Sequence, residues 1–309
     1  MKQFITIFLL LAATCTLSVA EEPIEPIPLS ADYDRSKAQI GKMLFFDPIL
    51  SKDRTLACVS CHDFDYGGAD YRRVSVGIAE RRGNVQSPTV LNARYNFKQF
   101  WNGRADDLRE QAAGPIHNPA ELGMSQAEVE ERLNADPHYA EIFKKVYGAK
   151  RVTYAMVLDA IVEFEKALTT PNSRFDRYLR GEESLSNEEL QGYRTFKELG
   201  CITCHNGINI GGNSFQRMGI IIPYRYDERY PDLYDEIAEE RYKNVFKVPT
   251  LRNIALTAPY FHDASAADLN EAVKTMSFHN LGFKPNDAQI ELLVAFLKTL
   301  TGEMPEILE

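Results

Sequence analysis

Two short stretches decide how the rest of the sequence is interpreted: CVSCH at residues 58–62 and CITCH at residues 201–205. Both follow the pattern C-x-x-C-H, which is typical of covalently attached c-type haem. Two thiols on one short helical turn can add to the two vinyl groups of a porphyrin, and the histidine that follows then presents its imidazole to the iron. The sequence therefore predicts two covalently bound haem c groups. Their attachment and axial residues are Cys58, Cys61 and His62 for the first haem, and Cys201, Cys204 and His205 for the second.

Other uses of paired cysteines fit this pattern less well. A zinc site built from two C-x-x-C pairs would be tetrahedral and would not need a histidine directly after each second cysteine. A thioredoxin-like redox pair would follow a strand in a βαβ unit, and no such unit is visible in the sequence. The fifth cysteine, Cys15, lies in the N-terminal leader, so the two motifs use every cysteine of the mature chain.

The composition excludes several classes of function. The chain has 309 residues, of which 44% are hydrophobic and 26% charged, as in ordinary globular proteins. The net charge of -9 argues against a nucleic-acid-binding protein, whose binding surface would be basic, and suits a basic protein partner.

Residues 1–20 have the pattern of a secretory signal peptide. Lys2 supplies the positive start, residues 4–13 are apolar, and Ser18-Val19-Ala20 is a small-x-small cleavage site. No later run approaches about 18 apolar residues, so no membrane span is expected after cleavage. The sequence thus predicts export to the periplasm.

Helical patterns dominate the rest of the chain. Ser125 with Glu128 and Ser186 with Glu189 form capping boxes, and residues 152–168, 187–199 and 287–300 have helical periodicity. No sustained alternation predicts a large sheet. The expected fold class is all-α, with two cytochrome c-like haem domains packed face to face.

The domain boundary is expected within residues 171–185, where helix signals lapse and charge rises. It divides an N-terminal peroxidatic haem domain, residues 21–176, from a C-terminal electron-transfer haem domain, residues 177–309. We leave open that the last residues pack back on the N-terminal domain.

With these features in place, the chain resembles the bacterial dihaem cytochrome c peroxidases and the related MauG-like enzymes over nearly its whole mature length. The segments that carry the resemblance are GKMLFFDPILSKDRTLACVSCH (41–62), SPTVLNARYNFKQFWNGRADDLREQAAGPI (87–116), TTPNSRFDRYL (169–179), CITCHNGINIGG (201–212) and VPTLRNIALTAPYFHDAS (248–265). The resemblance implies that the N-terminal haem reduces hydrogen peroxide and that the C-terminal haem receives electrons from a small c-type cytochrome or cupredoxin. It is also compatible with a homodimer.

The resemblance also assigns residues around the two haems. Met276 matches the family's axial ligand opposite His205, and a thioether there raises the haem potential. His262 matches a histidine beside the haem propionates, and Trp101 matches the residue that the family places between the haems. Gln111 and Glu121 match the two catalytic positions on the distal side of the N-terminal haem, where peroxide cleavage needs a proton carrier.

One position departs from the classic peroxidases. They carry a distal histidine on the loop after the first motif, whereas this chain has Ile78 there, and isoleucine cannot ligate iron. Three outcomes follow. The first is a five-coordinate haem that is active without prior reduction, which we favour. The second is replacement by another ligand, with His117 nearest in sequence. The third is a function other than peroxide turnover.

A calcium ion is an open expectation. The family often holds calcium with an asparagine and with carbonyls of a T-A-P segment; Thr257 and Pro259 are present here, but Gln86 stands where the asparagine would be. The leading function is a periplasmic dihaem peroxidase that reduces hydrogen peroxide to water. The alternatives are a MauG-like oxidase of a protein substrate, whose family branch has a tyrosine where Met276 stands, and a haem electron carrier or sensor without turnover.

Overall fold

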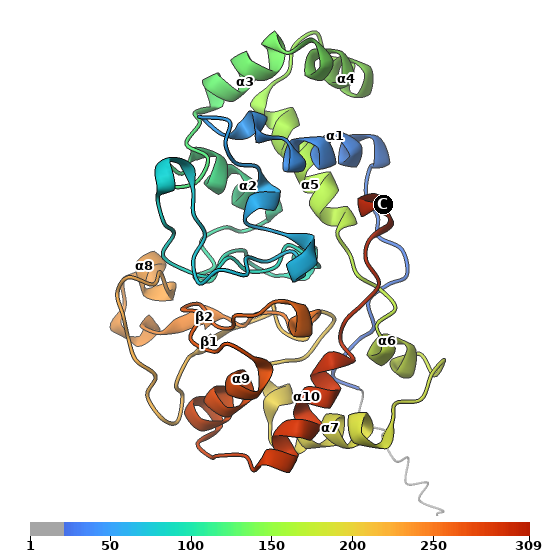
Figure 1. Cartoon of the computed structure of the whole chain (residues 1–309), viewed down its shortest axis with the longest axis vertical. Helices are drawn as coiled ribbons and strands as arrows, with labels where there is room; N and C mark the ends of the chain where they lie inside the picture. The colour runs from blue at the N-terminus through green and yellow to red at the C-terminus, as the bar shows by residue number, and fades with distance from the viewer. Residues whose placement is uncertain (1–21) are drawn as a thin grey trace, which may run out of the picture.

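The computed structural model describes residues 22–309, so the predicted signal peptide lies outside the described residues. The chain forms two halves stacked along the long axis of the molecule, with loops and a small hairpin where they meet (Figure 1). No helix among residues 22–309 is long and apolar enough to cross a membrane.

Five helices build the N-terminal half, and α1 packs along α5. The close approach depends on Gly41, because a β-carbon there would stand 2.0 Å from the carbonyl oxygen of Ala160. The buried cluster beneath them includes Ile40, Val157 and Ile161. The helices are α1 (Arg35–Phe46), α2 (Leu108–His117), α3 (Gln126–Ala135), α4 (Pro137–Tyr147) and α5 (Tyr154–Ala167).

The C-terminal half repeats this arrangement with α7 packed on α10. Here the glycine is Gly192, whose β-carbon would stand 2.0 Å from the carbonyl oxygen of Leu292. Phe175, Tyr193 and Phe296 form the centre of the second core. The helices are α6 (Arg174–Leu179), α7 (Asn187–Glu198), α8 (Leu233–Ile237), α9 (Leu269–Met276) and α10 (Asp287–Lys298).

The helix predictions are confirmed. Residues 152–168, 187–199 and 287–300 contain α5, α7 and α10, and both predicted capping boxes are formed. The sequence did not predict the antiparallel hairpin of β1 (Phe215–Arg217) and β2 (Val245–Lys247). Strands of three residues are too short to produce a recognisable alternation, so the all-α expectation needs this one addition.

Each end of the described chain packs against the opposite half: the first residues against the C-terminal half and the last residues against the N-terminal half. Ile24 lies in the C-terminal core, whereas Ile307 packs with Ala38 and Phe45 of the N-terminal half. Arg252 and Asp176 form a fully buried ion pair at 2.6 Å that also holds the N-terminal segment, because Arg252 donates to the carbonyl of Glu25 at 2.8 Å. The core residue Phe175 and the ion-pair residue Asp176 thus pack with the C-terminal half. The predicted boundary places both in the N-terminal domain, and that boundary stays a prediction.

Candidate active site

The two C-x-x-C-H motifs have the same local structure. Cys58–Ser60 and Cys201–Thr203 each form one 3₁₀ turn. The backbone N–H of each motif histidine then donates to the carbonyl of the first cysteine, at 3.0 Å in both motifs. The turn brings two thiols and an imidazole together, as attachment of a porphyrin requires.

Each motif histidine is also oriented by a backbone carbonyl. Nδ1 of His62 lies 3.2 Å from the carbonyl oxygen of Gly68, and Nδ1 of His205 lies 3.3 Å from that of Ile210. Burial lowers the pKa of both imidazoles, that of His205 to about 4, so both rings are neutral at pH 7. A neutral ring that donates from Nδ1 keeps the lone pair of Nε2 for a metal. These residues therefore fit an iron-bound haem.

The four motif cysteines form no disulfide within the described residues. Burial raises the pKa of Cys58 to about 12 and that of Cys201 to about 11, so neither ionises at neutral pH. Within residues 22–309, no group of three or more His, Cys, Asp or Glu side chains is placed to hold a metal ion. The geometry thus favours haem attachment over the zinc alternative, which needs four converging ligands.

Trp101 lies where the two halves meet. Its indole N–H donates to the carbonyl of Gln86 at 2.9 Å, and its own carbonyl accepts from the N–H of Lys247 in β2 at 2.8 Å. Its ring centroid is 6.2 Å from that of His262. These contacts place Trp101 between segments of both halves, and its role as an electron relay stays a prediction.

His262 is buried beside Trp101. Its ring stacks on Phe246 of β2, with centroids 4.1 Å apart, and burial lowers its pKa to about 4. Its carbonyl accepts from the N–H of Gln86 at 2.9 Å. Gln86 therefore joins Trp101 and His262, and its side chain donates to the carbonyl of Asp70 at 3.1 Å. These contacts neither require nor exclude calcium, which stays a prediction together with Thr257 and Pro259.

Glu121 lies in the turn that follows α2, the helix that carries half-buried Gln111. Burial raises the pKa of its carboxyl group. Two neighbours oppose this effect: Asn118 donates to Oε1 at 2.6 Å, and the positive charge of Arg104 favours the ionised form. A carboxyl group with a raised pKa and a fixed hydrogen-bond donor is suited to receive and return a proton.

The loop that carries Ile78 is fastened to the turn of Glu121. The Ile78 N–H donates to the carbonyl of Glu121 at 3.0 Å, and the Arg81 guanidinium donates to the carbonyl of Pro119 at 2.7 Å. A β-carbon on Gly77 would stand 1.8 Å from the carbonyl oxygen of Ala120, so only glycine fits there. The buried side chain of Ile78 packs against Gly123.

Arg104, whose charge acts on Glu121, and Phe100, which packs against α2, were not predicted from the sequence. The Arg104 guanidinium lies over the Phe100 ring at 3.4 Å, and Phe100 packs against Gly114 of α2. Arg104 also donates to Asn102 at 3.2 Å, which in turn donates to Glu236 of α8 at 2.8 Å. Nothing in the sequence separated Arg104 from the other basic residues, because its nearness to Glu121 exists only in the folded chain.

His117, the proposed replacement ligand, has other contacts. Its Nδ1 lies 2.8 Å from the carbonyl oxygen of Met124, and its ring centroid is 5.1 Å from that of Tyr154. His117 thus has the same kind of Nδ1-to-carbonyl contact as His62 and His205, and its role as a replacement ligand stays a prediction.

Met276 is the last residue of α9, where the helix widens into a π turn over Ser277–Leu281. Such turns are rare and frequently occur at functional sites. The π turn is fastened to the segment after β1, because the N–H groups of Ile221 and Ile222 donate to the carbonyl of His279 at 3.1 and 3.0 Å. Cys201 and Val273 of α9 pack against the same core, so α9 and the second motif share one half of the molecule.

The other methionines of the described chain fall into three groups according to where they lie in the fold. Met43, Met124 and Met156 belong to the N-terminal core, and Met304 is exposed. Met218, buried after β1, is the other methionine near the π turn.

Comparisons with known proteins agree with this site. A family model described as di-haem cytochrome c peroxidase matches residues 35–184. A cytochrome c551 peroxidase of Nitrosomonas europaea is 46% identical over 95% of this chain and 88% of its own length. The Escherichia coli cytochrome c peroxidase Ccp is 41% identical over 91% of this chain and 61% of its own.

Among solved structures, a MauG-like protein associated with microbial copper homeostasis superposes with a TM-score of 0.80 at 28% identity, covering 91% of this chain and 93% of that one. Sequence identity of this extent and the shared fold establish the relationship. The chain belongs to the family of dihaem cytochrome c peroxidases and MauG-like enzymes, and it is an oxidoreductase that acts on hydrogen peroxide.

Proposed function

We propose that this enzyme is a periplasmic peroxidase that reduces hydrogen peroxide to water with electrons from a small c-type cytochrome or cupredoxin. Electrons would enter at the C-terminal haem, held by Cys201, Cys204 and His205 with Met276 opposite. Peroxide would react at the N-terminal haem, held by Cys58, Cys61 and His62. The observation that carries the proposal is the half-buried Glu121 with its raised pKa, because an electron carrier has no use for a distal acid.

Haem iron supplies, when bound, the electrons that cleave the O–O bond of peroxide. The protein's own residues must move a proton from one peroxide oxygen to the other. Glu121 is suited to that transfer, because Asn118 fixes one carboxyl oxygen at 2.6 Å and the other accepts no hydrogen bond from the residues that the structure describes. Gln111, on the helix before it, is assigned to orient the substrate. Trp101 joins the two halves and is assigned to electron transfer between the haems.

The MauG-like alternative is favoured by the superposition on a MauG-like protein. Met276 speaks against it, because that branch carries a tyrosine as the second ligand of the C-terminal haem. The position of Met276 at the start of a π turn, a feature frequent at functional sites, supports the assignment.

The test is a turnover assay with a reduced small cytochrome c and, separately, a reduced cupredoxin. We expect peroxide-dependent oxidation of at least one donor, with two electrons consumed per peroxide. Pyridine haemochrome analysis should give two haems, and one after Cys201→Ser with Cys204→Ser. A protein with both haems that oxidises neither donor would overturn the peroxidase proposal.

A further inference from the structure

Lys247 is a buried lysine at the end of β2. The residue is 6% exposed. Burial is the sole cause that lowers its pKa, to about 8, which means that no carboxylate within the described part of the chain lies close enough to offset the burial. Lysine is almost never fully buried unless it is paired, because an unpaired ammonium loses its hydration without compensation.

The contrast with Arg252, five residues later, shows that this fold pairs its buried cations. Arg252 forms its ion pair with Asp176 at 2.6 Å and donates to the carbonyl of Ile208 at 3.0 Å. The fully enclosed polar atoms that lack a partner within residues 22–309 belong to Tyr154, Glu165 and Arg180. The Lys247 ammonium is not one of them, so it reaches space that the surrounding side chains leave open.

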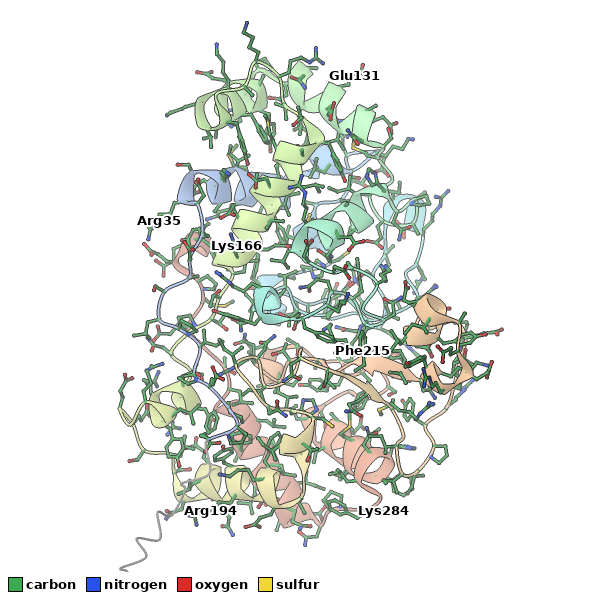
Figure 2. All side chains as sticks on the ribbon, turned by 180° about the vertical axis from the view of Figure 1, so that it is seen from behind. Arg35, Glu131, Lys166, Arg194, Phe215 and Lys284 are labelled. Atoms are coloured by element: carbon green, nitrogen blue, oxygen red, sulfur yellow. The ribbon has the colours of Figure 1, made fainter. Side chains whose placement is uncertain are left out.

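The position of Lys247 indicates what fills that space. Lys247 lies opposite Phe215 in the hairpin, and Phe215 is found where the two halves meet (Figure 2). Two residues on, the carbonyl of Pro249 packs against Gly211, whose β-carbon would stand 3.4 Å from Nδ1 of His205. The strand that carries Lys247 therefore runs beside the loop of the second haem motif.

Haem c brings carboxylates to such a site. Its two propionates lie on the edge of the porphyrin opposite the vinyl positions that the cysteines use. We propose that Lys247 binds a propionate of the haem attached at Cys201 and Cys204. The inference rests on the proposed covalent haems, and it adds a binding residue that no motif of the sequence indicates.

The test compares holoproteins that carry Lys247→Met, Lys247→Arg and Lys298→Met. Lys298 is an exposed lysine on α10 and controls for net charge. Haem content is measured first, because fewer than two haems in the unaltered protein would overturn the proposed haem sites rather than this inference. EPR-monitored potentiometric titration then follows each haem separately.

We expect Lys247→Met to lower the potential of the C-terminal haem, because a positive charge that favours the reduced form is lost. Lys247→Arg and Lys298→Met should leave that potential unchanged. Thermal unfolding provides a second readout, because a Lys247 bound to a propionate and an unpaired Lys247 predict opposite shifts of the unfolding midpoint. Loss of the partner of a buried propionate lowers the unfolding midpoint, whereas replacing an unpaired buried ammonium by methionine raises it.

An unshifted C-terminal potential, or a raised unfolding midpoint, in a variant with both haems attached would overturn the proposal. A shift confined to the N-terminal haem would overturn the assignment to the second haem. If Lys247→Met does not mature, Lys247→Gln removes the charge but keeps a hydrogen-bond donor, and the same outcomes apply to it.

Discussion

The backbone N–H of Ile78 donates to the backbone carbonyl of Glu121 at 3.0 Å. This bond joins the position at which the family's classic members carry a distal histidine to the residue proposed as proton carrier. The side chain of Ile78 is packed against Gly123 and has no atom that can ligate iron. The turn of Glu121 is thus held in place without an axial ligand from this loop.

The fully oxidised enzyme should therefore react with peroxide without prior reduction. EPR of the oxidised protein is expected to show one high-spin haem, and stopped-flow mixing with peroxide should give an immediate absorbance change. Ile78→Val, which keeps the position apolar, should behave in the same way. A low-spin N-terminal haem that stays inert until half-reduced would show that another side chain, His117 first, is the ligand.

Replacing Glu121 by glutamine should lower turnover by about 10²–10⁴-fold, the usual contribution of a positioned proton carrier. The variant keeps the shape of the side chain, so peroxide should still enter. Glu110→Gln, on the exposed side of α2, is the matched control and should leave turnover unchanged. Equal turnover rates for the Glu121 and Glu110 variants would show that Glu121 is not the proton carrier.

The pH dependence of turnover should report the environment of Glu121. Because burial raises the pKa of this carboxyl group, the acidic limb of the rate profile should lie above the ordinary range of glutamate, near 4.3. The positive charge of Arg104 lowers that pKa, so Arg104→Gln should move the limb to higher pH. A limb that stays in place in the Arg104 variant would contradict this electrostatic coupling.

Met276→Leu should lower the reduction potential of the C-terminal haem, since His/Met ligation raises it. Turnover should fall because electrons enter less readily, while peroxide still reacts at the N-terminal haem. Met218→Leu is the control, because Met218 is buried and its neighbours Arg217 and Gly219 both bond Asn280 of the π turn. If Met218→Leu moves the potential and Met276→Leu does not, Met218 rather than Met276 is the ligand.

Glu165 should make the stability of the enzyme depend on pH. It is 5% exposed on α5, its Oε2 is enclosed with no hydrogen-bond partner in the described part of the chain, and burial raises its pKa to about 8. Between about pH 4.3 and 8 the folded protein keeps this proton and the unfolded chain has lost it, so the free energy of unfolding falls as pH rises. Glu165→Gln should remove this loss, which reaches at most about 5 kcal/mol.

The measurement is the thermal unfolding midpoint of the holoprotein at pH 5 and pH 8.5. The difference in midpoint between Glu165→Gln and the unaltered protein should be larger at pH 8.5 than at pH 5, in favour of the variant. Glu141→Gln, an exposed glutamate of α4, should show no such divergence. Parallel midpoints for the Glu165 variant would mean that the carboxyl group has a partner in solution.

The sequence by itself determined the haem motifs, the helices and the family. C-x-x-C-H is a local pattern: its five consecutive residues form the turn that brings the two thiols and the histidine together, so spacing alone predicts that turn. The capping boxes and the periodicity of α5, α7 and α10 are equally local. The roles of Met276, Gln111, Glu121 and Trp101 came from resemblance, because spacing did not distinguish them from other residues of their type.

Only the tertiary structure decided which distant residues meet. Arg104 lies near Glu121, and the chain just after Lys247 packs beside the His205 loop. Oε2 of Glu165 is enclosed without a hydrogen-bond partner among residues 22–309. Each of these results from packing between segments far apart in the chain. The three-residue strands carry too little pattern to be predicted, yet they bring Lys247 and Phe246 to the junction of the halves. A charge changes its pKa through its neighbours and its burial, and both exist only after the chain has folded.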